Sequence, residues 1–229
     1  TAKLISGTVL EIGSGEGYGI RELVDKCDKY IAIDKYATKI NSQIQESKNI
    51  KFIECEVPPL KNIDDNCIDF VVSFQVIEHI HEDKYFLSEI KRVLKKNGKL
   101  ILTTPNKKMS LSRNPWHIRE YTVGEMTDLL ADFFPNTKVM GVFGNEKVMS
   151  YYKKNKEAIQ KITRFDIFNL QYKLPRWILQ IPYDILNRFN RHALEDDNSQ
   201  LVKSVTTKDY YIDTTNEECL DHFCISTKN

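Results

Sequence analysis

Short apolar runs rich in β-branched residues alternate with amphipathic stretches along the first 144 residues. This alternation is typical of strands joined by crossover helices in a mostly parallel sheet. It predicts an α/β fold for this part of the chain. The predicted strands are Thr8–Ile12, Tyr30–Asp34, Ile50–Glu54, Ile68–Phe74, Lys99–Thr104 and Thr137–Phe143.

Local signals mark two helices and one loop. Apolar residues recur at helical spacing over Glu82–Lys96, and Asn97-Gly98 supplies a C-terminal stop. A second helix begins at Thr122, because Thr122 and Glu125 have the spacing of a capping box. Residues 57–67 carry two prolines and mixed polar residues, so we expect a loop there and no crossover helix.

The chain changes character after Gly144, and no strand-like run follows until Leu220–Ser226. Residues 150–192 hold nine basic and three acidic residues, a local net charge of +6. We expect Pro175 and Pro182 to break this segment into short helices. Its aromatic residues include Phe165, Phe168, Tyr172, Trp177, Tyr183 and Phe189.

The overall composition excludes several classes of protein. The 33 Lys and Arg residues nearly balance 32 Asp and Glu, so no global charge marks a nucleic-acid partner. The 41% of hydrophobic residues is typical of a folded globular chain. No apolar run approaches the ~20 residues that cross a bilayer, and the N-terminus lacks a signal-peptide core, so we expect a cytoplasmic protein. The five cysteines form no CxxC pair, and we expect them to be reduced.

A glycine-rich turn follows the first predicted strand. The run Val9–Gly19 leads from that strand through Gly13, Gly15 and Gly17 into a predicted helix. Glycines are needed where a backbone approaches a nucleotide-like ligand, because a Cβ would clash with the ligand or forbid the turn. Asp34 ends the second strand, where a carboxylate can accept hydrogen bonds from both ribose hydroxyls.

Two ligands compete for this turn, a nicotinamide or flavin dinucleotide and S-adenosylmethionine. A dinucleotide sets its pyrophosphate on the helix N-terminus and favours GxGxxG, whereas here Gly17 comes one residue early. Carboxylates flank the turn at Glu11 and Glu16. They would repel a pyrophosphate but tolerate the ammonium and sulfonium groups of S-adenosylmethionine. The residues therefore favour the cationic ligand.

With these motifs the chain resembles the class I S-adenosylmethionine-dependent methyltransferases of the type 11 and type 23 branches. Cys55 and Glu56 depart from the Gly-Asp-Ala-like turn that this family usually has beside the adenine. The resemblance covers residues 1–144 and the final strand. The runs that carry it are Val9–Gly19, Ile31–Asp34, Phe52–Val57, Asp69–Ile80 and Arg92–Asn106.

The resemblance implies a Rossmann-like sheet of seven mostly parallel strands flanked by helices, in the order 3-2-1-4-5-7-6. Leu220–Ser226 would be the antiparallel seventh strand. Residues 145–218 would form a helical insertion or lid between strands six and seven of a single domain spanning 1–229. Because family members usually carry helices before the first strand, we also expect part of the protein to precede Thr1.

The resemblance also implies the cofactor site. Asp34 would bind the ribose, the turn at 52–57 would lie beside the adenine, and Phe74 and Gln75 would border the cofactor. Tyr18 would either stack near the methionine moiety or pack on the first helix. The residues implied for S-adenosylmethionine are Glu11, Gly13, Gly15, Gly17, Tyr18, Asp34, Glu56, Val57, Phe74 and Gln75.

Methyl transfer requires alignment and desolvation of the nucleophile, and the acceptor decides whether a general base helps. Glu78 and His79 follow the fourth strand at the edge where ligands bind in such sheets, and His79 is either catalytic or a cap for the next loop. His117 is either an acceptor-site base or orienter, or part of a loop tether in which Arg119 and Glu120 form an ion pair. We expect His81 to be a solvated residue at a helix start.

We expect no metal site, because Cys219, His222 and Cys224 alternate faces of one strand and lack a fourth ligand. The leading hypothesis is a methyltransferase that acts on a small-molecule or glycan-type acceptor at oxygen. The alternatives are a dinucleotide-dependent oxidoreductase and a non-catalytic cofactor-binding module that acts through 145–218. The basic and aromatic segment 150–192 would be a solvated cover, a dimer contact, or a surface for a membrane or a lipid-linked acceptor.

Overall fold

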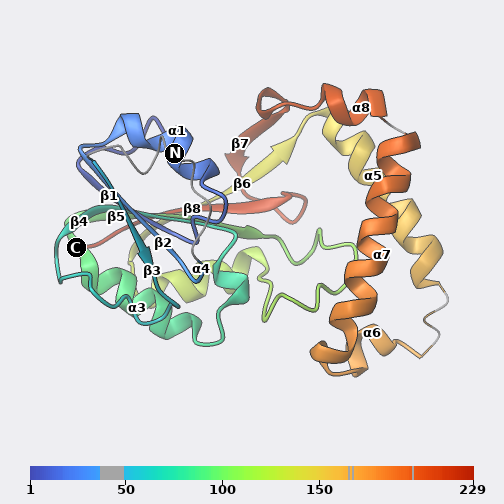
Figure 1. Cartoon of the computed structure of the whole chain (residues 1–229), viewed down its shortest axis with the longest axis horizontal. Helices are drawn as coiled ribbons and strands as arrows, with labels where there is room; N and C mark the ends of the chain where they lie inside the picture. Colours follow the sequence, from blue (N-terminus) through green and yellow to red (C-terminus); the bar gives the residue numbers. More distant parts are fainter. Residues whose placement is uncertain (37–48, 165, 167, 198) are drawn as a thin grey trace.

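An eight-stranded sheet forms the centre of the computed structural model (Figure 1). Its strands lie in the order β3-β2-β1-β4-β5-β8-β6-β7; neighbours among the first five are parallel, and the remaining pairs are antiparallel. The structure describes residues 1–36, 49–164, 166, 168–197 and 199–229. The strands are β1 (Thr8–Ile12), β2 (Lys29–Asp34), β3 (Ile50–Glu54), β4 (Ile68–Phe74), β5 (Leu94–Pro105), β6 (Asn136–Gly144), β7 (Tyr210–Thr214) and β8 (Asp221–Thr227).

The predicted strand order is confirmed, and one strand is added to it. The strand predicted near the C-terminus is β8, which runs antiparallel between β5 and β6. The added strand, β7, pairs with β6 at the edge, where the rings of Phe143 and Tyr211 stack with centroids 5.6 Å apart. All five residues of β7 are exposed. It therefore lacks the alternation of apolar and polar positions that predicts a half-buried strand.

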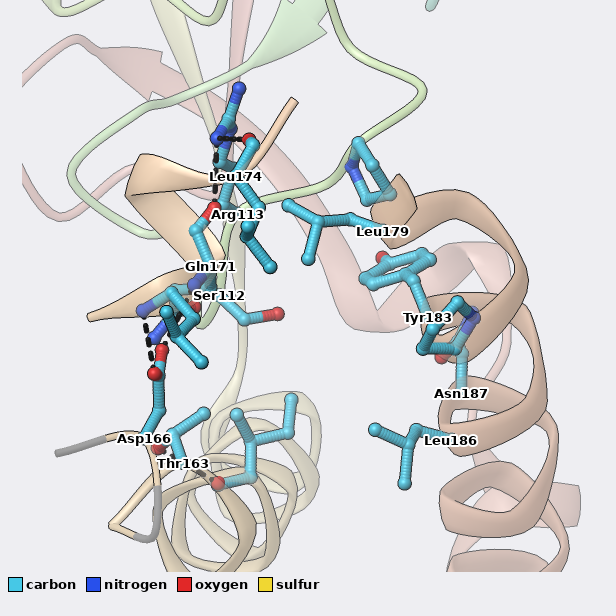
Figure 2. A pocket seen from close by; sticks show the side chains of 14 residues that line it. Ser112, Arg113, Thr163, Asp166, Gln171, Leu174, Leu179, Tyr183, Leu186 and Asn187 are labelled. Carbon is cyan, nitrogen blue, oxygen red and sulfur yellow. Dashed lines mark hydrogen bonds between the residues drawn. The ribbon is translucent and has the colours of Figure 1, made fainter. Parts of the chain in front are cut away.

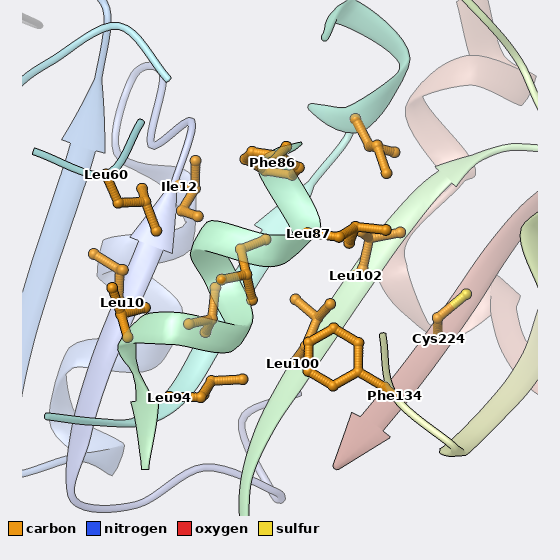
Figure 3. Packing of buried hydrophobic residues seen from close by; sticks show 14 of the residues in the cluster. Leu10, Ile12, Leu60, Phe86, Leu87, Leu94, Leu100, Leu102, Phe134 and Cys224 are labelled. Atoms are coloured by element: carbon orange, nitrogen blue, oxygen red, sulfur yellow. The ribbon is translucent and has the colours of Figure 1, made fainter. Parts of the chain in front are cut away.

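Helices cover both faces of the parallel part of the sheet (Figure 1). Because side chains alternate along a strand, β1 sends Leu10 and Ile12 into one hydrophobic cluster and Val9 into the other. Figure 3 shows Phe86 and Leu87 of α3 in the first cluster, packed with the strand residues. The helices of this region are α1 (Tyr18–Leu23), η1 (Val24–Lys26), η2 (Ile77–His79), α3 (Asp83–Val93) and α4 (Val123–Ala131).

The helix predicted over Glu82–Lys96 forms but ends early. It stops at Val93, because Leu94 already pairs with Ile68 in the sheet. Asn97, with a left-handed φ of 62°, lies inside β5 at an irregularity in its pairing with β4. The Asn97-Gly98 signal therefore marks a bulge in a strand and not the end of the helix.

Two other local predictions are confirmed. The side chains of Thr122 and Glu125 each bond to the other residue's backbone N–H group, which forms the capping box of α4. Residues 57–67 contain no helix or strand.

Residues 145–218 place a group of helices to one side of the sheet (Figure 1). Pro175 directly precedes α7. The prediction that Pro182 breaks a helix is wrong, because the 22-residue helix α7 continues on both sides of it. A proline inside a helix removes one backbone hydrogen bond, and the rest of the helix tolerates that loss here. Phe165 lies outside the described residues. No helix in the described ranges combines the length and apolar content needed to cross a bilayer. The elements are α5 (Glu146–Thr163), α6 (Leu170–Lys173), α7 (Arg176–Asp197), α8 (Ser199–Ser204), η3 (Thr207–Asp209) and β7.

Candidate functional site

The three glycines in the turn between β1 and α1 have left-handed backbone conformations. The φ angle is 77° at Gly13, 49° at Gly15 and 78° at Gly17. At Gly13 space also excludes a side chain, since a Cβ there would lie 2.4 Å from Cγ2 of Val76. At Gly15, no atom of the described residues comes within 4 Å of the position that a Cβ would take. The turn is therefore tightly packed at Gly13 and faces open space at Gly15.

Asp34 joins the end of β2 to this turn. Its Oδ2 accepts a hydrogen bond from the N–H of Gly15 at 2.8 Å, and its Oδ1 accepts one from the N–H of Tyr36 at 3.0 Å. Each carboxylate oxygen retains a further lone pair, so the side chain can still accept hydrogen bonds from ligand hydroxyls. The structure thus brings together two residues that the sequence analysis assigns to one ligand.

Glu11 is a buried carboxylate at the end of β1, and only 2% of its surface is exposed. A Cβ on Gly19 would lie 1.8 Å from its Oε1, so the glycine lets α1 pack against the carboxylate. Burial raises the pKa of Glu11 to about 7; the nearby Tyr30 hydroxyl opposes this rise and the charge of Asp34 adds to it. Neither that hydroxyl nor Oε2 reaches hydrogen-bonding geometry with a described residue. Such a carboxylate favours a cationic neighbour.

Tyr18 and Glu56 lie near the same end of the sheet and are exposed. The guanidinium of Arg21 lies over the Tyr18 ring, 5.2 Å from its centroid, so Tyr18 contacts its own helix. Glu56 forms an ion pair with Lys35 at 2.7 Å, and the hydrogen bond from Lys35 lowers the pKa of Glu56. Tyr18 directly follows the glycine turn, and Glu56 follows β3 at the same edge of the sheet.

The other residues assigned to the cofactor follow β3 and β4. Val57 is half-buried against the hydrophobic cluster on the α3 side, and Phe74 is half-buried against the cluster on the α1 side. Gln75 has a left-handed φ of 57°, and its N–H donates to the carbonyl of Thr103 at 2.9 Å. The carboxyl ends of parallel strands share one edge of the sheet, which is where ligands bind in such folds.

Two histidines meet at this edge although 37 residues separate them. The rings of His79 and His117 meet edge to face with centroids 4.9 Å apart. Nδ1 of His79 lies 3.0 Å from the carbonyl oxygen of Trp116, and Nδ1 of His117 lies 2.6 Å from Oε1 of Glu120. Partial shielding from solvent lowers the pKa of His79. The structure therefore brings together the two histidines that the sequence analysis singles out.

Glu78, which the sequence places beside His79 at the end of the fourth strand, completes this cluster. Its side chain is 1% exposed, and Oε2 accepts a hydrogen bond from the Thr104 hydroxyl at 3.0 Å. Burial raises the pKa of Glu78 to about 7. One ligand atom from each of Glu78, His79 and His117 lies within 4.8 Å of the other two. The sequence signal for this residue is the Glu-His pair that follows β4.

The ion pair between Arg119 and Glu120, which belonged to the loop-tether alternative for His117, does not form. Arg119 instead pairs with Asp83 at the start of α3, while Glu120 accepts hydrogen bonds from His117 and Ser110. The two side chains therefore meet different partners.

His81 is exposed, as expected. Cys219, His222 and Cys224 do not form a common site: His222 lies next to Cys219, whereas Cys224 lies in a hydrophobic cluster. Nε2 of His222 bonds to the carbonyl of Tyr121 at 2.9 Å, and Nδ1 lies 3.8 Å from Sγ of Cys219. Cys224 packs in the hydrophobic cluster on the α3 side.

The loop that carries His117 is attached to the helices of 145–218. Nη1 of Arg113 donates to a backbone carbonyl of α6 at 2.8 Å, and Nε1 of Trp116 donates to Oδ1 of Asp184 in α7 at 2.9 Å. A polar pocket of about 330 Å³ includes His117 in its wall. A larger and mostly apolar pocket of about 460 Å³ adjoins it through Ser112 and Arg113 (Figure 2).

Comparisons with known proteins point to one family. A family model described as a methyltransferase domain matches residues 10–102. The chain is 35% identical over 141 residues to a probable S-adenosylmethionine-dependent methyltransferase of Mycobacterium tuberculosis. The aligned region covers 59% of this chain and 51% of that protein. It is also 26% identical over 105 residues to the mitochondrial ubiquinone biosynthesis O-methyltransferase of Dictyostelium discoideum, and this aligned region covers 45% of this chain and 32% of that protein. The chain thus spans about half the length of the mycobacterial relative.

Solved structures share the fold across nearly the whole chain. The YcgJ protein of Bacillus subtilis superposes with a TM-score of 0.55 at 14% identity, over 97% of this chain and 92% of that one. The [4+2]-cyclase SpnF superposes with a TM-score of 0.53 at 15% identity, over 99% of this chain and 78% of that one. At these identities the likeness shows the fold alone, and the cyclase shows that the fold also serves another reaction. The matched family model, the mycobacterial relative and the shared fold together support a class I S-adenosylmethionine-dependent methyltransferase domain in this chain.

Proposed function

We propose that this chain transfers the methyl group of S-adenosylmethionine to an oxygen atom of a small-molecule or glycan-type acceptor. The observation that carries the cofactor part is the placing of two carboxylates, Asp34 and the buried Glu11, around the open turn at Gly15. This arrangement suits a ligand with a ribose and a positive charge and repels a pyrophosphate. The cofactor supplies a methyl group on a positively charged sulfur.

Different residues around the turn bind different parts of such a ligand. Asp34 accepts hydrogen bonds from the ribose hydroxyls, and the ionised Glu11 stabilises the cationic end of the ligand. The glycines let the backbone approach without a side chain between. The other residues proposed to contact the cofactor are Tyr18, Glu56, Val57, Phe74 and Gln75.

On the acceptor side, we assign His79 and His117 to orienting the reacting hydroxyl. Nδ1 of His79 donates to the carbonyl of Trp116, and Nδ1 of His117 donates to the carboxylate of Glu120. Because the proton is on Nδ1 in both rings, the lone pair of each ring is on Nε2. His117 also forms part of the wall of the polar pocket, which is large enough for a sugar-sized group. The O-methyltransferase among the relatives supports oxygen as the methylated atom.

The apolar pocket favours an acceptor that carries a hydrocarbon chain. Figure 2 shows Leu179, Tyr183 and Leu186 of α7 facing the pocket from one side. Ser112 and Arg113 lie in the walls of both pockets, so the two spaces adjoin, and in our proposal one molecule extends from His117 into the apolar space. We therefore propose a lipid-linked acceptor whose polar group lies at His117.

A row of exposed apolar residues on α7 supports the idea that the acceptor is bound in a membrane when the protein reaches it. Trp177, Ile181 and Ile185 recur at a spacing of four residues, and all three side chains are exposed. Exposed apolar residues mixed with basic ones are typical of helices that lie on a lipid surface.

Two substitutions in α7 that introduce the same charge distinguish the role of the apolar pocket from the role of the exposed surface. Leu179 lines the apolar pocket, whereas Ile181 is 71% exposed and is not part of its wall. Leu179→Asp should raise the KM for a dissolved dodecyl glycoside at least tenfold and leave binding to anionic vesicles unchanged. Ile181→Asp should have the reverse effects. Equal effects of both variants in both assays would contradict the assignment.

The activity itself is tested with labelled S-adenosylmethionine and a panel of methyl and alkyl glycosides, phenols, proteins and nucleic acids. We expect label in a hydroxyl-bearing small molecule and a loss of at least tenfold in kcat for His117→Gln. Label confined to protein or nucleic acid would contradict the acceptor class. Binding of the cofactor without transfer to any acceptor would favour a non-catalytic module.

A further inference from the structure

Three side chains of metal-ligand type meet where β4 ends. Glu78 and His79 come from η2, and His117 comes from the loop between β5 and α4. A ligand atom from each lies within 4.8 Å of the other two. Metal–ligand bonds of about 2.0–2.2 Å hold ligand atoms roughly 3–4 Å apart, so small side-chain rotations would bring these three atoms onto one ion.

Both imidazoles have the support that metal-binding histidines need. A carbonyl or carboxylate oxygen can only accept a hydrogen bond, so Nδ1 carries the proton in His79, facing Trp116, and in His117, facing Glu120. The lone pair of each ring is then on Nε2. Histidines that bind metals usually donate their other N–H to such an oxygen, which fixes the ring and raises its basicity. At His117, Nε2 lies 2.8 Å from the side-chain amide of Asn114, which must rotate away when an ion binds.

Glu78 supplies a second and independent observation. Its carboxylate is buried and accepts one hydrogen bond from Thr104, but no lysine or arginine in the described part of the chain forms an ion pair with it. A buried carboxylate without a cationic partner is costly, and a divalent cation would offset that cost.

The backbone holds the two halves of this cluster together. The carbonyl of Glu78 accepts hydrogen bonds from the N–H groups of Ile118 and Arg119, at 2.6 and 3.2 Å. These bonds fasten the loop that carries His117 directly to η2. The two backbone segments that carry the three side chains are therefore held together before any ion binds, which lowers the entropic cost of binding one.

We propose that Glu78, His79 and His117 bind one divalent transition-metal ion, such as Zn²⁺, Co²⁺ or Mn²⁺. Two imidazoles and one carboxylate leave coordination positions open, which is typical of catalytic metal sites. Since His117 belongs both to this cluster and to the wall of the polar pocket, the ion would lie next to the space proposed for the acceptor.

The role of the ion in catalysis rests on the proposed methyl transfer. The ion binds the acceptor oxygen and lowers the pKa of its hydroxyl group, whose proton passes to solvent. A lone pair of that oxygen then forms the bond to the methyl carbon while the carbon–sulfur bond breaks, and sulfur keeps the bonding electron pair. The histidines thus orient the acceptor through the ion and do not themselves remove its proton.

The test titrates Co²⁺ and Zn²⁺ into the chelator-treated full chain by calorimetry, with no cofactor or acceptor present. Visible absorption of bound Co²⁺ reports nitrogen and oxygen coordination independently of activity. We expect one ion per chain. His79→Gln, His117→Gln and Glu78→Gln should each weaken its binding at least tenfold and change or abolish the Co²⁺ spectrum. His81→Gln is the matched control, because this exposed histidine lies two residues from His79 and outside the cluster, and it should bind the ion as the unmodified chain does.

Glu120→Gln tests the positioning of His117, and we expect metal affinity to fall by about 10–100-fold although Glu120 does not touch the ion. His79 is exposed, so His79→Gln should keep the thermal unfolding midpoint of the metal-free chain, which separates loss of the site from loss of the fold. No binding to the unmodified chain, or equal binding to all variants, would overturn the proposal. Because the titration contains no cofactor, its result is independent of whether the proposed methyl transfer is correct.

Discussion

Glu11→Gln should stabilise the free protein and weaken cofactor binding at the same time. The pKa of Glu11 is about 7 in the folded protein against a usual value of 4.5. At ~1.36 kcal/mol per pKa unit, this difference places the cost of the ionised side chain at about 3 kcal/mol. Glutamine keeps the shape of the side chain and removes the ionisation, so the variant avoids this cost.

The sign of the pH dependence follows from proton linkage. The folded state holds the Glu11 proton more tightly than the unfolded state, so this stabilising contribution is complete below pH 4.5 and is lost as the pH rises to about 7. We therefore expect Glu11→Gln to match the unmodified chain near pH 4.5 and to exceed its free energy of unfolding by up to about 3 kcal/mol at pH 8. Urea unfolding at a series of pH values measures this difference. Glu16→Gln is the control, because Glu16 is exposed beside the same turn.

Cofactor binding should show the opposite trend. A cationic ligand favours the ionised carboxylate, so affinity for S-adenosylmethionine should rise between pH 6 and 8 and binding near neutral pH should release a proton. Calorimetry in two buffers of different ionisation enthalpy detects that proton. In Glu11→Gln the proton release should disappear. Equal stability of the two proteins at every pH, together with a pH-independent affinity, would refute the account of Glu11.

Three further substitutions test the turn and the scaffold. Asp34→Ala should weaken binding of S-adenosylhomocysteine by about 1–3 kcal/mol in calorimetry; an unchanged dissociation constant would remove Asp34 from the ribose. Gly15→Val should reduce that affinity at least tenfold, because the side chain enters the open space of the turn, and its left-handed conformation should cost about 1–2 kcal/mol in urea unfolding; retained affinity would place the ligand elsewhere. Arg92→Ala should lower the free energy of unfolding by about 1–3 kcal/mol, because Arg92 bonds to Glu89 and to two carbonyls of residues 60–63; an unchanged urea midpoint would contradict this.

The central strands could be predicted because they are buried on both faces and therefore appear as apolar runs. β7 could not be found in this way, since all of its residues are exposed and pairing with β6 holds it in place. Its Tyr-Tyr-Ile run has high strand propensity and was the one available signal. The early end of α3 also depends on a long-range contact, the pairing of Leu94 with Ile68.

The cofactor side of the site was more predictable than the acceptor side. The glycine turn and Asp34 lie at the ends of consecutive strands, so their meeting follows from the parallel topology. The meeting of Glu78 and His79 with His117 depends on backbone hydrogen bonds between η2 and a distant loop. No local pattern encodes such bonds, and the same holds for the actual partners of Arg119 and Glu120.

The most direct test of the central claim is calorimetric titration of the full chain with S-adenosylmethionine, S-adenosylhomocysteine and NADH in parallel. Both adenosyl ligands should bind at one site per chain with micromolar affinity, and NADH should produce no binding heat. Preferential binding of NADH would contradict the cationic-ligand site around Glu11 and Asp34, and binding of none of the three would contradict the cofactor site altogether.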